Sequence, residues 1–243
     1  LIVRRVCFCA LQYKKKLYIC KFEIAGMKFK DIAGQTDVAN RLTEIIDSGR
    51  VSHAQLFLGA SAEGSMALAW AYLQYLCCSH REHYGEGGLR ADSCGECPEC
   101  KKMQSLMHPD LLMVFPNATT AKVKSNPSSG EFASEFREFL LASGGRGTLD
   151  DWLHELDIDN KQAIINVRDA ELIEKRLALK SYEGGWKMVL VWMPEKMNGE
   201  CANKLLKTLE EPTSRTLLLL VGESDERLLP TIRSRVQTVR LPR

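Results

Sequence analysis

The 243-residue chain contains no hydrophobic run long enough to cross a bilayer and carries almost no net charge. A transmembrane helix needs about 20 consecutive apolar residues, so no membrane partner is expected. With 33 Lys and Arg against 31 Asp and Glu, the net charge is +2, which gives the whole chain no overall attraction for nucleic acid. Internal repeats are also absent. A composition of 45% hydrophobic and 26% charged residues fits one large globular domain or two small ones.

The nine cysteines are unevenly spread, which argues against a secreted disulfide scaffold. Their clustering favours a reducing compartment, so we expect a cytoplasmic protein that uses them to bind a metal. Five of them lie close together in the sequence, at Cys77, Cys78, Cys94, Cys97 and Cys100.

The stretch "SCGECPEC" contains two overlapping C-x-x-C pairs, formed by Cys94, Cys97 and Cys100. Structural zinc is bound tetrahedrally by four ligands, so a fourth is needed. The end of the preceding apolar segment offers Cys77 and Cys78, and His80 and His83 are further candidates. A redox pair would not need a third cysteine at the same spacing.

The remaining pattern predicts an α/β fold, a parallel sheet covered by helices on both faces. Short, almost uniformly apolar runs alternate with segments of helical periodicity. Residues 1–26 differ in composition, and we expect them to be an extension outside a domain of residues 27–243. The expected strands are 54–59, 109–116, 186–193, 216–223 and 236–241, and the clearest expected helices are 36–49, 65–78 and 201–211.

The segment "FLGASAEGSMALA" lies where a phosphate-binding loop belongs, between a strand and a helix. Gly59 and Gly64 have the spacing of G-x-x-x-x-G-K-[ST]. Ser65 stands at the lysine position, and Met66 stands where a hydroxyl would bind Mg²⁺. A thioether is a poor ligand for this hard cation. The strand "MVLVW" also runs into Met193 rather than an acidic residue, so ATP hydrolysis is not expected.

Five motifs occur together in one order: "HAQLFLGASAEG", "CGECPEC", "HPDLLMVFP", "ANKLLKTLEEPT" and "LLPTIRSR". In this the chain resembles the bacterial clamp-loader subunits of DNA polymerase III, which are AAA+ ATPases. The resemblance covers 27–243. It implies a five-stranded parallel sheet of the AAA+ P-loop NTPase type with a small inserted zinc module at about 77–101. It also places the family's lid and collar domains beyond 243.

The resemblance assigns roles to particular residues. It implies a structural zinc held by Cys78, Cys94, Cys97 and Cys100, with Cys77 facing the core. It makes Gly59, Gly64 and Ser65 a degenerate phosphate loop. The family motif Ser-Arg-Cys appears as Ser234, Arg235 and Val236, which implies that Arg235 is an arginine finger acting on a neighbouring subunit.

The function implied is that of a non-hydrolysing subunit of the DNA polymerase III holoenzyme, itself neither polymerase nor ATPase. Its expected partners are the gamma/tau and delta subunits of a five-membered ring, the sliding clamp, and primed DNA reached through the complex. Two alternatives remain. One is an active clamp-loader ATPase of the gamma/tau type, and the other is a zinc-dependent nucleic-acid-binding module.

Overall fold

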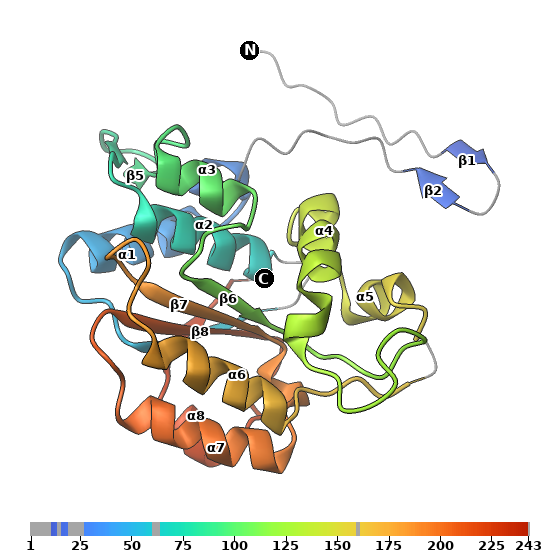
Figure 1. Cartoon of the computed structure of the whole chain (residues 1–243). Helices are drawn as coiled ribbons and strands as arrows, with labels where there is room; N and C mark the ends of the chain where they lie inside the picture. The colour runs from blue at the N-terminus through green and yellow to red at the C-terminus, as the bar shows by residue number, and fades with distance from the viewer. Residues whose placement is uncertain (1–10, 14–15, 19–26, 60–63, 159–160, 243) are drawn as a thin grey trace.

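The computed structural model describes residues 11–13, 16–18, 27–59, 64–158 and 161–242 (Figure 1). Most of the expected extension 1–26 therefore lies outside the described residues. Within it, β1 (Leu11–Tyr13) and β2 (Lys16–Tyr18) pair antiparallel with each other. Met27 is buried in the main core.

A five-stranded parallel sheet forms the centre of the molecule, in the order β6-β7-β8-β3-β9. The predicted parallel α/β architecture is therefore confirmed. Every residue of β3 and β8 is buried, as expected for strands that are apolar at nearly every position. The five strands are β3 (Ala54–Leu58), β6 (Leu111–Val114), β7 (Lys187–Trp192), β8 (Thr216–Gly222) and β9 (Gln237–Arg240).

Helices cover both faces of this sheet (Figure 1). On one face lie α1 (Thr36–Asp47), α2 (Ser65–Cys77), α3 (Pro98–Gln104), α4 (Ala133–Ser143) and α5 (Leu149–Glu155), and on the other α6 (Val167–Ala178), α7 (Gly199–Glu210) and α8 (Pro230–Arg233). Short 3-10 turns are η1 (Phe29–Asp31), η3 (Ser129–Phe132) and η4 (Pro194–Lys196), and β4 (Glu82–His83) pairs antiparallel with β5 (Ala91–Asp92).

The two faces of the sheet bury separate hydrophobic cores. In β7, Met188, Leu190 and Trp192 belong to the core shared with α1 and α2, whereas Val189 and Val191 belong to the core shared with α6 and α7. This alternation follows from the two-residue period of a β-strand. A strand that is apolar at every position is stable only with a helix layer on each side.

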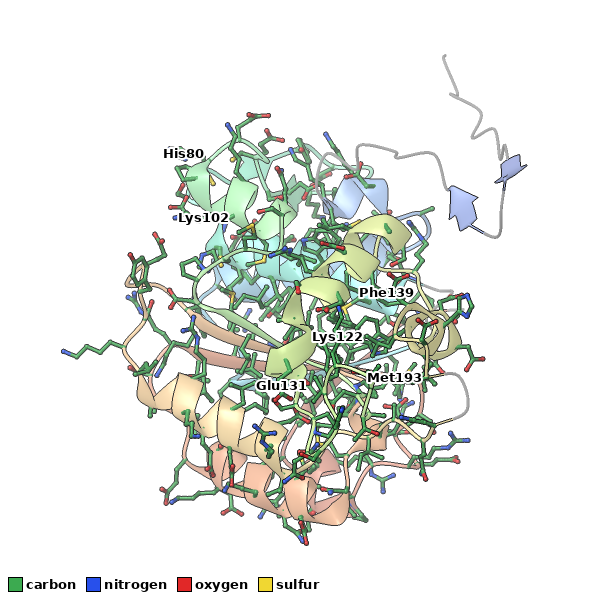
Figure 2. All side chains as sticks on the ribbon, turned by 45° about the vertical axis from the view of Figure 1, so that its right-hand side comes forward. His80, Lys102, Lys122, Glu131, Phe139 and Met193 are labelled. Atoms are coloured by element: carbon green, nitrogen blue, oxygen red, sulfur yellow. The ribbon has the colours of Figure 1, made fainter. Side chains whose placement is uncertain are left out.

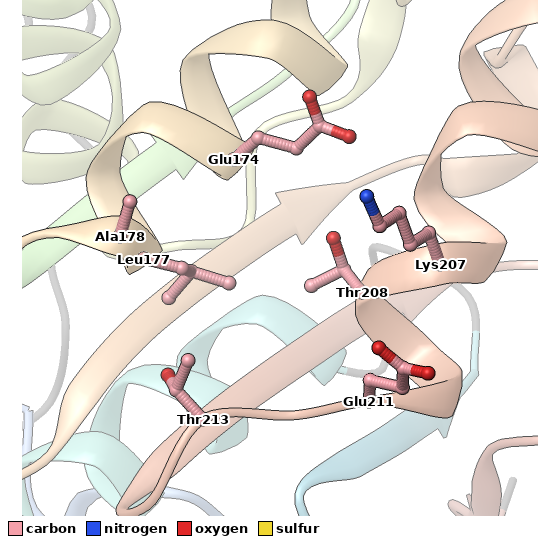
Figure 3. Close-up of a pocket in the computed structure, with 7 residues that line it drawn as sticks. All are labelled: Glu174, Leu177, Ala178, Lys207, Thr208, Glu211 and Thr213. Carbon is pink, nitrogen blue, oxygen red and sulfur yellow. The ribbon is translucent and has the colours of Figure 1, made fainter.

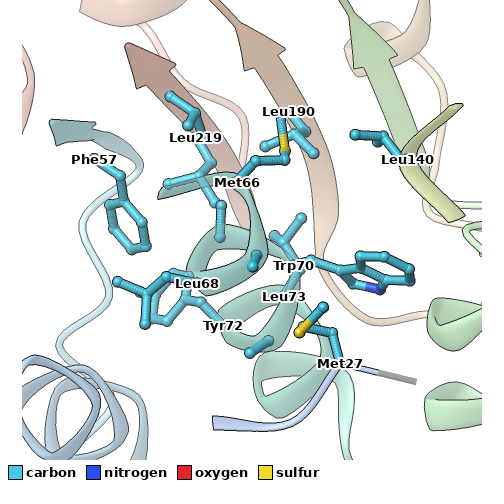
Figure 4. Packing of buried hydrophobic residues seen from close by; sticks show 14 of the residues in the cluster. Met27, Phe57, Met66, Leu68, Trp70, Tyr72, Leu73, Leu140, Leu190 and Leu219 are labelled. Carbon is cyan, nitrogen blue, oxygen red and sulfur yellow. The ribbon is translucent and has the colours of Figure 1, made fainter. Parts of the chain in front are cut away.

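Helix α2 is the most deeply buried helix of the first layer. Every residue from Ser65 to Leu76 is buried, and Figure 4 shows its side chains packed against Phe57, Leu190 and Leu219 of the sheet. A helix that is apolar all round needs neighbours on all sides. The indole Nε1 of Trp70 donates to the carbonyl oxygen of Met103 at 2.8 Å, which ties α2 to the cysteine-rich segment on its outer side.

An aromatic cluster joins α4 and α5 to the sheet. The rings of Phe115 and Phe136 stack with centroids 3.8 Å apart, and Trp152 packs edge-on against both. Trp152 also donates to the carbonyl oxygen of Pro116 at 2.8 Å, and Trp192 contacts the rings of Phe136 and Phe139. Both tryptophans are therefore core residues and are unavailable to stack on a nucleic-acid base.

The His108–Asp110 segment shapes the turn before β6. The Asp110 carboxylate accepts from the hydroxyl of Ser181 and from the backbone N–H groups of Tyr182 and Glu183, at 2.8–2.9 Å. Burial opposes ionisation of Asp110, but these donors outweigh it and lower the pKa of its carboxyl group. In the described part of the chain, no helix combines the length and apolar composition needed to cross a membrane.

Candidate functional site

Four cysteine side chains meet beside the end of α2. They come from two places in the chain: Cys78 follows α2 directly, Cys94 and Cys97 lie in the turn that leads into α3, and Cys100 lies in the first turn of α3. Their sulfur atoms all lie within 4.8 Å of one another. The structure thus brings together the four residues that the family resemblance implied.

The spacing of these sulfurs suits a tetrahedral metal ion. Zn–S bonds of about 2.3 Å set the sulfurs of a regular tetrahedron about 3.8 Å apart. The Cys78–Cys94 and Cys94–Cys100 sulfur pairs are separated by 3.6 and 4.0 Å, which brackets that value. A disulfide would need about 2.05 Å, and all four thiols are free. The donor set therefore fits zinc and leaves no position for a substrate.

Backbone amides point at the sulfurs of this cluster. The N–H groups of Glu96 and Cys97 donate to Cys94 Sγ at 3.4 Å each, and Cys100 N–H donates to Cys97 Sγ at 3.5 Å. Burial opposes ionisation of Cys94, but the donors outweigh it and lower the pKa of its thiol to about 7. N–H donors favour the thiolate, which is the form that binds a metal.

Cys77 does not belong to this cluster. Its Sγ packs 3.3 Å from Met188 Sδ, and burial raises the pKa of its thiol to about 12. His80 and His83 are exposed, and the Nδ1 atom of His80 lies 3.0 Å from the hydroxyl of Ser79. Figure 2 shows His80 on the outer surface of the module. None of the three joins the group of sulfurs.

The segment after residue 26 holds the cysteine module in place. Lys28 Nζ donates to the carbonyl oxygen of Cys94 at 2.6 Å. The carboxylate of Asp92 accepts from the backbone N–H groups of Phe29 and Lys30, both at 3.1 Å. Asp92 is completely buried, so these bonds are shielded from water. Order at the cysteine cluster is therefore coupled to the packing of η1 against α2.

The structure describes both ends of the predicted phosphate loop, at Gly59 and Gly64. Gly59 N–H donates to the carbonyl oxygen of Gly222 at 3.1 Å, and Gly64 begins α2 in the left-handed region at φ 80°, which favours glycine. Ser65 and Met66 follow, each only 3% exposed. Figure 4 places Met66 beside Leu190 and Leu219. The side chain at the magnesium-ligand position is therefore part of the hydrophobic core.

The loop after α4 lies directly against the first turn of α2. Gly145 is buried with φ 69°, and a Cβ atom added there would lie 3.0 Å from the nitrogen and 3.1 Å from the Cα of Ala67. Nothing in the sequence pattern signals this contact, because Gly145 and Ala67 are far apart in the chain. The loop after α4 therefore packs against the backbone at the start of α2.

We expect Gly145→Ala to destabilise the fold by about 2–4 kcal/mol, since it combines a strained positive φ with a backbone clash. Gly49→Ala is the matched control, because Gly49 has φ 68° but nothing within 4 Å of its added Cβ. It is expected to cost only about 1 kcal/mol. Urea unfolding of both variants measures the difference, and equal costs would show that the Gly145–Ala67 contact is loose.

The end of β7 lacks the acidic side chain of a working ATPase. Met193 adopts a left-handed backbone at φ 54° and is buried. Glu195 Oε1 accepts from the backbone N–H of Glu223 at 3.0 Å, and its Oε2 would lie 2.8 Å from a Cβ atom on Gly222. Burial raises the pKa of the Glu195 carboxyl group. The Glu195 side chain therefore hydrogen-bonds to and packs against the backbone at the end of β8.

Arg235 lies on the surface just after α8. Its Nη2 atom is 2.6 Å from Glu210 Oε1, and its Nη1 donates to the carbonyl oxygen of Thr231 at 3.0 Å. The hydroxyl of Ser234 donates to the same carbonyl oxygen at 3.1 Å. Both Ser234 and Arg235 are exposed, so the guanidinium is not enclosed by its own subunit. Sequence reasoning missed Glu210 as its partner.

The charged face of α7 is paired rather than freely solvated. Lys204 contacts Glu171 at 3.3 Å and Glu174 at 3.6 Å, both on α6. Lys207, Thr208 and the end of α7 border a groove of about 330 Å³ against α6 (Figure 3). Surface ion pairs of this kind contribute little to stability, and α6 and α7 pack together mainly through their shared hydrophobic cluster.

These features define a class of protein: an α/β domain with a five-stranded parallel sheet between two layers of helices and a four-cysteine module between α2 and β6. The family model described as "DNA polymerase III, delta subunit" matches residues 34–243. The chain belongs to this family, and the predicted resemblance to DNA polymerase III clamp-loader subunits is confirmed.

Individual relatives agree with this assignment. The chain is 29% identical to the DNA polymerase III subunit delta' of Pseudomonas aeruginosa, over 77% of this chain and 43% of that one. It is 28% identical to subunit delta' of Bacillus subtilis, over 84% and 46%. Subunit tau/gamma of Haemophilus influenzae is 25% identical, over 85% and 22%. The chain thus spans less than half the length of these relatives.

Among solved structures, a DNA polymerase III gamma subunit-related protein from Thermotoga maritima aligns with a TM-score of 0.42 at 18% identity. The alignment covers 84% of this chain and 45% of that one. The family assignment rests on the family model and the sequence relatives, not on this alignment.

Proposed function

We propose that the protein is a non-hydrolysing clamp-loader subunit of the delta' type, which helps to load the sliding clamp onto primed DNA during replication. The observation that carries the proposal is the buried Met66 at the magnesium-ligand position, beside Ser65 at the lysine position. A site without the lysine charge and without a hard oxygen ligand lacks what phosphoryl transfer requires. Relatives named delta' in two bacteria support the same role.

In this role the protein acts on its neighbours. Arg235 donates its guanidinium to the nucleotide site of an adjacent ATPase subunit, where it stabilises the charge that develops on the transferred phosphoryl group. Its exposure on the surface supports this assignment. The partners are the gamma/tau and delta subunits, the sliding clamp and, through the assembled complex, primer-template DNA.

Zinc is the metal proposed for the cysteine cluster. Four thiolates close the coordination sphere, so the ion supplies structure and no chemistry. Residues 77–101 form the module, and residues 27–243 form the AAA+ domain, with 1–26 outside it and the family's lid and collar expected beyond 243. A cytoplasmic location fits free thiols and a role in replication.

The main alternative is an active ATPase of the tau/gamma type, since tau/gamma subunits also match. Titration calorimetry with Mg-ATP separates the two functions. Working ATPases have KM values of about 1 μM to 1 mM, so the proposal predicts no saturable heat and no phosphate release from the protein alone up to about 1 mM nucleotide. Saturable binding with turnover would favour the alternative.

A zinc-dependent nucleic-acid module is the second alternative. It predicts DNA binding by the protein alone that weakens steeply with salt. The net charge of +2 and the core positions of Trp152 and Trp192 both weigh against it.

A further inference from the structure

We propose that Glu210 is a positioning residue that holds Arg235 against its own subunit and so restrains the arginine finger until an adjacent triphosphate competes for it. This inference rests on the proposed function, since it concerns how the finger becomes available. Nothing in the motif that contains Arg235 indicates it, because Glu210 lies on a different helix.

The contact is short and supported from two sides. Arg235 Nη2 lies 2.6 Å from Glu210 Oε1, while Nη1 donates to the carbonyl oxygen of Thr231 at 3.0 Å and to the Ser234 hydroxyl at 3.4 Å. The guanidinium is therefore held between the end of α7 and the turn of α8. The side chains remain 36% and 51% exposed, so another subunit can still reach them.

Core packing sets the position of this pair. Leu209, the neighbour of Glu210, and Ile232, three residues before Arg235, are 3% and 1% exposed and belong to the same hydrophobic cluster. Because Leu209 and Ile232 are both buried in this cluster, the position of α7 relative to α8 is fixed. The carboxylate consequently stands beside the finger in the folded subunit before any partner binds.

The same donors that bind Glu210 are those that a phosphate would use. A guanidinium presents its N–H groups in a planar fork that fits carboxylate and phosphate oxygens equally well. The carboxylate also cancels the positive charge that the finger contributes in the transition state. Engagement with a neighbour's triphosphate therefore exchanges the Glu210 oxygen for phosphate oxygens, and no covalent bond changes.

The expected restraint is modest. Exposed ion pairs favour the bound geometry by about 1.4- to 5-fold, so a neighbouring triphosphate can overcome the restraint. A pair of this strength lowers turnover when the ring is loosely assembled and has little influence once the clamp and DNA hold the subunits together. Glu210 thus reduces idle ATP hydrolysis.

The test compares Glu210→Gln, Arg235→Ala and the double variant in the reconstituted complex, measuring ATP turnover without clamp or DNA. Glu210→Gln is expected to raise kcat about two- to fivefold with KM unchanged, because the finger acts on the transition state. In about 1 M salt the Debye length falls to about 3 Å, which weakens the ion pair, so the difference in kcat between Glu210→Gln and the wild type should disappear. The double variant should match Arg235→Ala.

Glu211→Gln is the control, since Glu211 is also exposed and forms no ion pair with any described residue. If Arg235→Ala lowers turnover but Glu210→Gln lowers kcat or leaves it unchanged, the proposed restraint by Glu210 is wrong. The arginine-finger role proposed for Arg235 is not contradicted by that result. If Arg235→Ala leaves turnover intact, the proposed function itself fails. A change of equal size in the Arg235→Ala background would show that Glu210 acts by another route, which also overturns the proposal.

Discussion

Cys100→Ser is expected to release zinc and to unfold the module around α3. Cys100 is completely buried and its sulfur is one of the four in the cluster. The substitution leaves three thiolates to bind the ion and replaces the fourth sulfur ligand with a hydroxyl group. Structural zinc contributes about 10–16 kcal/mol of apparent binding free energy in small zinc-dependent domains, so a loss of several kcal/mol in stability is expected. Elemental analysis of the purified protein gives the zinc content, and thermal unfolding gives the stability.

Cys77→Ser is the matched control for this experiment. Cys77 is adjacent to the proposed ligand Cys78, but its sulfur packs against Met188 on the sheet. The variant should keep its zinc and lose only about 1–2 kcal/mol of stability from the core. Release of zinc by Cys77→Ser together with retention by Cys78→Ser would reverse the assignment of the fourth ligand.

Arg235→Ala is expected to reduce ATP turnover at the adjacent subunit's site by about 10³- to 10⁵-fold, the range found for arginine fingers. The assay uses the assembled complex in which the other nucleotide sites have been inactivated, so that one site is observed. The fold and the zinc content should not change, because the side chain is exposed and remote from the cysteine cluster.

Arg233→Ala controls for the loss of a surface charge near the same interface. Arg233 is also exposed, two residues earlier, and has no ion pair with any described residue. It should leave turnover within about twofold of wild type, as most surface substitutions change interaction energies by less than about 0.5 kcal/mol. Equal losses in both variants would point to general interface charge and not to a finger.

The sheet could be predicted well from the sequence because four of its five strands are almost uniformly apolar, whereas β9 is mostly exposed. The expected strand 186–193 is β7 (Lys187–Trp192), and 236–241 contains β9 (Gln237–Arg240). The helix expected at 36–49 ends two residues earlier, at Asp47. Uniform burial leaves little freedom in such segments, so a local pattern is sufficient to identify them.

Helix α5 (Leu149–Glu155) was missed. Its signal was present: Thr148 accepts from the backbone N–H of Asp151 at 3.2 Å, and Asp151 accepts from that of Thr148 at 2.9 Å. This is a capping box, which the neighbouring glycines obscured. The helix is short, and its tertiary support comes from Trp152, buried among other aromatic rings, and from Leu149 and Leu153, which pack against the main core.

The site could be predicted only where its residues lie close together in the chain. The three-cysteine stretch and the paired glycines are local motifs, and the family resemblance added Cys78. The contacts of Glu210 with Arg235, of Gly145 with Ala67 and of Lys28 with Cys94 join distant segments. Such contacts depend on how the layers pack, which no single stretch of sequence encodes.

We propose that this chain has the fold of a nucleotide-binding domain but does not hydrolyse ATP, and that it acts on the ATPase site of a neighbouring subunit. DNA-stimulated ATP turnover tests this proposal most directly, measured for the protein alone and for the clamp-loader complex reconstituted with and without it. The account predicts no turnover by the protein alone and a complex that depends on its presence for clamp- and DNA-stimulated turnover. Hydrolysis of Mg-ATP by the protein alone, or equal stimulated turnover in its absence, would contradict the account.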